Sequence, residues 1–129
     1  MNEYIESLER EFSSIENGFK EEEKRAFTDY KSNDSEFIKK LAFLSYQSEV
    51  YQVRMYSVFL FGYLSEDKNI LMFLRDDPSE YVRKSVGNAL RDISKKYPEL
   101  IRVELSTWSL ETKGIKQVYQ LANKLLIKS

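Results

Sequence analysis

The sequence predicts an all-α fold, a right-handed solenoid of about eight helices arranged in antiparallel pairs. Three observations indicate this class: apolar residues recur at helical spacing, only two prolines and four glycines interrupt 129 residues, and one helix pattern recurs at a fixed interval. The length fits one domain that buries a sizeable core, so we expect residues 1–129 to form a single repeat domain.

Helical spacing of apolar residues places the elements in chain order. The predicted helices span residues 3–16, 19–30, 34–45, 53–64, 66–74, 78–95, 98–108 and 115–127. The helix over 53–64 is almost continuously apolar, so we expect it to be buried on most sides and its aromatic residues to belong to the core.

Polar residues and prolines indicate where these helices start. Asn33 followed by Glu36 is a capping-box pattern that opens the third helix. Asp77 is expected to cap the helix over 78–95, with Pro78 at its first position and Glu80 completing the box.

Further signals set the remaining limits. Gly18 is expected to end the first helix, and Ser65 to cap the short fifth one. Pro98 starts the seventh helix, and Gly114 is expected to break the chain before the last.

Two helices repeat each other at an interval of 29 residues. The matched pairs are Val53 with Val82, Arg54 with Arg83, Ser57 with Val86, Leu60 with Ala89, Phe61 with Leu90 and Leu64 with Ile93. A two-helix unit that recurs at a fixed period is typical of a solenoid, here of the HEAT-like kind.

The composition excludes several kinds of chemistry. The chain has no Cys and no His, so zinc sites and Cys or Ser–His nucleophiles are not expected, nor is any metal or cofactor. No apolar run approaches the roughly 20 residues that span a bilayer, and the N-terminus does not resemble a signal peptide. We expect a cytoplasmic protein that does not bind membranes.

Charge is unevenly distributed along the chain. Residues 1–64 hold eight basic and twelve acidic side chains, whereas residues 65–129 hold twelve basic and nine acidic ones. The weakly basic second half is able to touch phosphates, although it lacks the strong basic footprint of a dedicated nucleic-acid binder.

One stretch of the second half also resembles a known family. The residues that carry the resemblance are Ser79-Glu80-Tyr81-Val82-Arg83-Lys84-Ser85-Val86-Gly87-Asn88-Ala89-Leu90-Arg91-Asp92-Ile93-Ser94-Lys95-Lys96, Tyr97-Pro98-Glu99-Leu100 and Trp108. They are similar to the C-terminal repeat of the DNA alkylation repair family, which comprises alkylpurine DNA glycosylases built from HEAT-like repeats and their non-catalytic relatives. The chain resembles a shortened member.

The resemblance implies a scaffold without an intact active site. Family glycosylases curve a basic concave face around DNA, and their catalysis is associated with an Asp in a Trp-Trp-Asp type segment, which this sequence lacks. Asn88 stands where one subgroup has a groove Trp, while Arg91 matches a family Arg. The catalytic residues therefore stay unknown.

Polar stripes supply the candidate contacts to DNA. Eight residues are candidates: Arg54, Arg83, Lys84, Asn88, Arg91, Lys95, Lys116 and Lys124. Helical spacing puts Lys84 to Lys95 on one stripe and Lys116 to Lys124 on another, which form parallel basic ridges if both helices line the concave face.

Structural interpretations stand beside these functional ones. The stripes are also typical of solvated helix faces, and Arg83 is also expected to pair with Asp76 or Asp77. Asp92 and Glu104 are weak catalytic candidates, since Asp92 is expected to pair with Lys95 or Lys96. Trp108 and Tyr97 are candidates to stack on a base, although a single Trp at the end of an apolar helix is also typical of core packing.

We therefore expect a non-catalytic module that contacts the backbone of double-stranded DNA or a protein partner. The alternatives are a DNA N-glycosylase that excises alkylated purines, and a protein–protein scaffold whose end faces bind a second copy or another chain.

Overall fold

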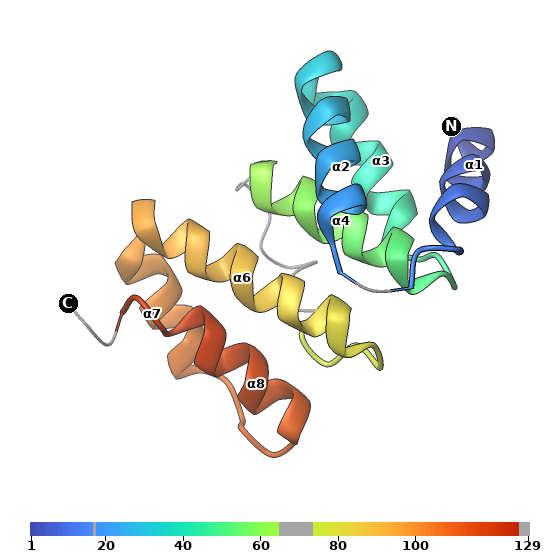
Figure 1. Ribbon diagram of the computed structural model, residues 1–129. Helices are drawn as coiled ribbons and strands as arrows, with labels where there is room; N and C mark the ends of the chain where they lie inside the picture. Colours follow the sequence, from blue (N-terminus) through green and yellow to red (C-terminus); the bar gives the residue numbers. More distant parts are fainter. Residues whose placement is uncertain (17, 65–73, 127–129) are drawn as a thin grey trace. The chain divides into compact units, whose positions relative to one another are not determined.

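The computed structural model describes residues 1–16, 18–64 and 74–126, and every regular element within them is an α-helix (Figure 1). The described helices are α1 (Asn2–Phe12), α2 (Lys20–Ser32), α3 (Ser35–Ser45), α4 (Tyr51–Leu64), α6 (Glu80–Lys96), α7 (Pro98–Ser106) and α8 (Lys113–Ala122). The all-α prediction is confirmed. The short helix predicted after Ser65 falls outside the described residues.

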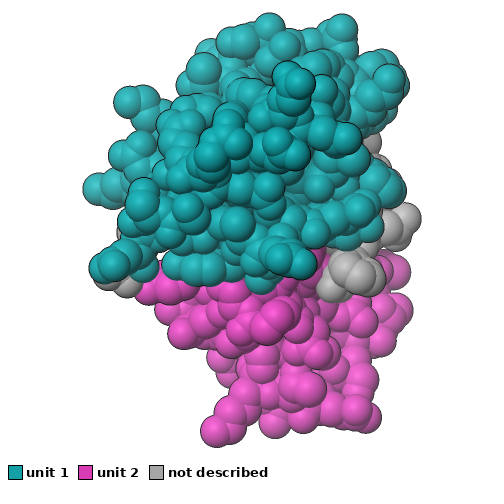
Figure 2. Space-filling model, turned by 90° about the vertical axis from the view of Figure 1, so that its right-hand side faces the viewer, with its two compact units in different colours: residues 1–67 teal, residues 68–129 magenta. Residues whose placement is uncertain are grey.

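The chain divides into two compact units, which Figure 2 shows in teal and magenta. We call residues 1–67 the N-unit and residues 68–129 the C-unit. None of the described helices in either unit is long and apolar enough to cross a membrane.

Helix α4 forms the centre of the N-unit, where α1, α2 and α3 pack against it. Its side chains are largely buried, as the apolar run predicts, and Tyr56 and Leu60 have no exposed surface. Leu8 and Phe12 of α1 and Leu41 of α3 are buried as well and belong to the same apolar core, in which the rings of Phe12 and Tyr56 lie 6.0 Å apart.

A polar network crosses this core. The hydroxyls of Tyr4 and Tyr56 both donate to Oδ2 of Asp29, each at 2.6 Å, so one carboxylate joins α1, α2 and α4. Burial, followed by the hydrogen bond to Asp29, raises the pKa of the Tyr56 hydroxyl above its ordinary value. Both hydroxyls therefore remain protonated donors at neutral pH.

In the C-unit, α6 and α8 run side by side in the same direction (Figure 1). They approach closely at Gly87, where an added Cβ would lie 2.7 Å from Cβ of Leu121 and 3.3 Å from the carbonyl oxygen of Val118. A side chain at this position would push the helices apart.

Trp108, which follows α7, is buried, as packing predicts, with its ring 4.9 Å from the Arg75 guanidinium.

Two predicted helix caps are wrong by one or two residues. Oδ1 of Asp34, not Asn33, accepts the Phe37 N–H at 2.8 Å and caps α3. Ser79, not Asp77, caps α6, while Oδ1 of Asp77 accepts the Ser79 N–H at 2.9 Å. At both helix starts two nearby side chains are able to accept a hydrogen bond, Asn33 and Asp34 in one case and Asp77 and Ser79 in the other. Only the conformation of the backbone turn decides which of the two faces the free N–H groups of the helix.

The first and last helices are shorter than predicted. Helix α1 ends at Phe12 instead of near residue 16, and α8 ends at Ala122 instead of 127. Gly114 does not break the chain, because it is the second residue of α8, which Thr112 caps by accepting the Ile115 N–H.

Candidate nucleic-acid interface

The two repeated arginines make the same contacts. Nη1 of Arg54 donates to the carbonyls of Ser48 at 2.9 Å and Glu49 at 3.1 Å. Nη1 of Arg83 donates to the carbonyls of Asp77 at 2.8 Å and Pro78 at 3.2 Å. The partners lie six and five residues before the arginine in both cases, so each guanidinium fixes the turn that leads into its own helix.

Arg83 bonds backbone carbonyls where the sequence suggested a carboxylate partner. Its side chain lies against Gly114, where an added Cβ would be 2.9 Å from Cδ of Arg83 and 3.3 Å from Oδ1 of Asp76. The same Asp76 oxygen accepts the Thr112 hydroxyl at 3.3 Å. Gly114 thus leaves room for the Arg83 stem at the start of α8.

The predicted stripe on α6 is present, opposite the buried Val82, Val86, Leu90 and Ile93. Nζ of Lys84 lies 3.3 Å from Oε1 of Glu80, on the same helix. Asp92 pairs with Lys95 at 3.5 Å, as expected, and with Nε of Arg91 at 3.8 Å. The stripe therefore carries its own counter-charges on the helix surface.

A side-chain bridge joins α6 to α8 beside this stripe. Nε2 of Gln117 donates to Oε1 of Glu80 at 3.1 Å. This hydrogen bond, followed by the interaction with Lys84, lowers the pKa of the Glu80 carboxyl. Glu80 is therefore charged at neutral pH and connects the basic residue of one helix to the polar face of the next.

The stripe on α8 is shorter than predicted. Lys116 lies on the helix and is exposed. Lys124 is also exposed but lies in the turns after Ala122, where its N–H donates to the carbonyl of Leu121 at 3.3 Å. The C-unit thus carries Lys84, Asn88, Arg91 and Lys95 on α6, Lys116 on α8 and Lys124 in the turns after it, whereas Arg54 belongs to the N-unit.

The two units carry opposite net charges. The N-unit holds eight basic and fourteen acidic side chains, a net charge of −6, and the C-unit holds twelve basic and seven acidic ones, a net charge of +5. Among the residues that the structure describes, no group of acidic side chains is arranged to hold a metal ion. The basic charge gathers in the unit that contains α6 and α8.

Sequence reasoning missed the residues that set the spacing of this face. Gly87 and Gly114 permit the close approach of α8 to α6, and Gln117 bridges the two helices. For Gly87 the available signal was a glycine inside a predicted helix, because such a glycine lowers helix stability and so indicates a packing reason.

Two solved structures from Streptococcus mutans are similar to this chain. AlkD2 is 44% identical over 95% of this chain and 97% of the solved one, with a TM-score of 0.53. The protein smu.31, from strain UA159, is 42% identical over the same shares, with a TM-score of 0.48. No family model matches the sequence, and the comparison with curated proteins finds no match.

The described helices, together with the likeness to AlkD2, place the chain in the class of HEAT-like helical repeat proteins, as the sequence predicts. The 44% identity to AlkD2 over nearly the whole of both chains defines the group within that class. The chain belongs to the AlkD-like DNA alkylation repair family.

Proposed function

We propose that this protein binds the backbone of double-stranded DNA, without catalysis, through the basic face that α6, α8 and the turns after α8 form. The observation that carries the proposal is the side-by-side, parallel course of α6 and α8, each with exposed cations, in a unit of net charge +5. Two basic ridges on adjacent parallel helices are suited to contact phosphates along a groove.

The ion pairs on α6 do not prevent this binding. Lys84, Lys95 and their acidic partners are at least half exposed, and such surface pairs contribute only about 0–1 kcal/mol. A phosphate oxygen is therefore able to replace Glu80 or Asp92 as the partner at little cost. Lys116 and Lys124 add two exposed ammonium groups.

A variant that neutralises three cations tests the proposal. We expect Lys84→Gln/Arg91→Gln/Lys124→Gln to weaken binding to a fluorescein-labelled 20-base-pair duplex on the order of tenfold at low salt, measured by fluorescence anisotropy. The three side chains lie on the surface or near it, so circular dichroism should show unchanged helix content.

The matched control removes the same charges from the N-unit. Arg10→Gln/Lys24→Gln/Lys40→Gln also replaces one Arg and two Lys, all exposed, and leaves the net charge equal to that of the first variant. We expect its affinity for DNA to stay within about twofold of the wild type. Equal losses in both variants would show that only net charge matters and would remove the α6–α8 face as the site.

Two alternative functions, excision of alkylated purines and a protein–protein scaffold, predict different experimental results. Membership of the DNA alkylation repair family supports excision of alkylated purines, and release of base from alkylated DNA under single-turnover conditions would replace the non-catalytic proposal. A stable dimer on gel filtration, with no DNA binding at low salt, would instead favour the scaffold.

A further inference from the structure

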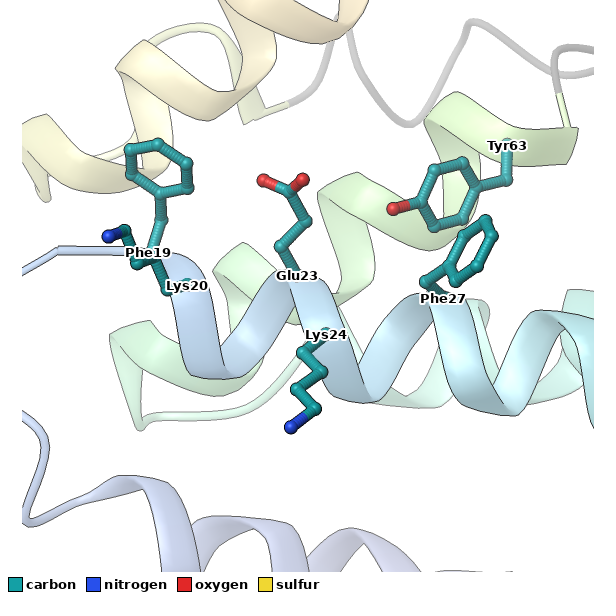
Figure 3. A pocket seen from close by; sticks show the side chains of 6 residues that line it. All are labelled: Phe19, Lys20, Glu23, Lys24, Phe27 and Tyr63. Carbon is teal, nitrogen blue, oxygen red and sulfur yellow. The ribbon is translucent and has the colours of Figure 1, made fainter.

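The N-unit contains an open hollow of about 590 Å³ along α2. Figure 3 shows its lining, which comes from α2, the residue that precedes it and the last turn of α4. The lining residues are Phe19, Lys20, Glu23, Lys24, Phe27 and Tyr63. Its volume is within the range of small-ligand sites, and it lies outside the basic face of the C-unit.

Aromatic rings form the walls of this hollow. Phe19 and Phe27 are 47% and 46% exposed, which is unusual for phenylalanine. Phe27 packs against Tyr63 with centroids 5.7 Å apart, and Phe19 against Phe59 at 6.3 Å, so neighbours hold both rings in place. The sequence interpretation put Tyr63 in the core, whereas the structure places it half-exposed on this wall.

A carboxylate lies between the walls. Figure 3 shows Glu23 pointing into the hollow between Phe19 on one side and the Phe27–Tyr63 pair on the other. Within the described part of the chain Glu23 forms no ion pair, while Glu11 and Glu36 pair with cations on the same unit. Lys24 points to the opposite side of α2, away from Glu23 (Figure 3).

Carboxylate and aromatic faces together favour a flat cation. Aromatic rings attract cations to their faces, and a carboxylate binds a guanidinium through two parallel hydrogen bonds. Phe27 already has one cation on its ring, because Nζ of Lys31 lies 4.9 Å from the centroid. The net charge of −6 on the N-unit attracts basic peptides and repels nucleic-acid backbone.

We propose that this hollow binds an arginine side chain presented by a basic segment of a protein partner. The guanidinium stacks on Phe19 or Phe27 and donates hydrogen bonds to the carboxylate of Glu23, while the aliphatic stem covers the ring of Tyr63. No residue that lines the hollow belongs to the α6–α8 face. Each of the two proposals is therefore tested without reference to the other.

The full-length protein and a short peptide test this site. The probe is acetyl-Gly-Arg-Gly-amide, followed by ¹H–¹⁵N chemical shifts of the intact chain. We expect saturable shifts at Phe19, Glu23 and Phe27. The same peptide with citrulline, which keeps the shape and loses the charge, should bind at least about tenfold more weakly.

Matched variants separate the carboxylate from general acidity. Glu23→Gln should weaken arginine binding about tenfold, and Glu21→Gln, on the same helical turn but outside the hollow, should leave it unchanged. Phe27→Leu should weaken it about threefold through loss of the ring face.

Three results would overturn the proposal. They are equal binding of the citrulline peptide, equal loss in Glu23→Gln and Glu21→Gln, and shifts at these residues with the cationic nucleoside 7-methylguanosine but not with the arginine peptide. The last result would assign the hollow to a base instead of a protein side chain.

Discussion

The N-unit and the C-unit contain the same arginine contact in opposite surroundings. Arg54 and Arg83 each bind two carbonyls at the same sequence offsets, 29 residues apart. In the N-unit one shared carboxylate, Asp29, joins three helices, and the unit carries net negative charge. The C-unit joins two parallel helices through Gly87 and carries net positive charge.

This comparison distinguishes the contacts that stabilise a repeat from the surface charges that select its binding partner. The arginine contact recurs because each repeat needs its entry turn fixed before the second helix begins. Surface charge is free to diverge, since exposed charges contribute little to stability. We therefore expect family members to share the buried contacts and to differ in the exposed charges, which decide the binding partner.

The largest expected change in the free energy of unfolding comes from removing the Asp29 carboxylate of the N-unit. Asp29→Ala should lower the free energy of unfolding by about 3 kcal/mol, because it leaves the Tyr4 and Tyr56 hydroxyls without their acceptor. Tyr4→Phe, which removes one donor near the surface, should cost about 1 kcal/mol. Amide hydrogen exchange of α2 and α4 measures both. Similar costs for the two variants would mean that Asp29 does not join the two hydroxyls.

The next effect tests the close approach in the C-unit. Gly87→Val should destabilise this unit by about 2 kcal/mol, because its side chain would overlap Leu121. Fluorescence of Trp108, the single Trp of the chain, reports unfolding of the C-unit. Adding Leu121→Gly, which removes the Cβ that the new side chain would overlap, should recover part of the loss in Gly87→Val while destabilising the wild type. Strictly additive losses would contradict contact at this position.

A pair of variants tests the equivalence of the two arginines. Arg54→Met and Arg83→Met should each cost about 1.5 kcal/mol in the unit that contains the change, since each loses two charge-assisted hydrogen bonds. Arg10→Met, at an exposed position of α1, should have little effect. Hydrogen exchange resolves the two units. A loss at only one arginine would show that the repeated contact is not equally important in both.

The smallest effect is a gain in stability at Glu22. This side chain has no exposed surface, neither carboxylate oxygen has a hydrogen-bond partner among the described residues, and burial raises its pKa. Glu22→Met should stabilise the N-unit by about 1 kcal/mol at pH 7. Because the folded pKa lies above the unfolded one, the wild type loses stability as pH rises between the two values. The gain should therefore shrink near pH 4, and thermal unfolding at both pH values measures it.

Prediction from sequence succeeded where the signal was periodic and failed where it depended on contacts between helices. The apolar spacing located every described helix, and the 29-residue interval paired Arg54 with Arg83. Gly114 was taken for a break because nothing local distinguishes a helix-breaking glycine from one that admits the Arg83 side chain. The hollow around Glu23 combines residues from α2 and α4, so no single segment indicates it.

The salt dependence of DNA binding tests the central claim most directly. Binding of the duplex is measured from about 25 to 200 mM salt for the wild type and for Lys84→Gln/Arg91→Gln/Lys124→Gln. If the α6–α8 face neutralises one phosphate with each of these cations, the slope of log K against log salt should become shallower by about 2.7 in the variant. An unchanged slope, or the same change in Arg10→Gln/Lys24→Gln/Lys40→Gln, would contradict the account.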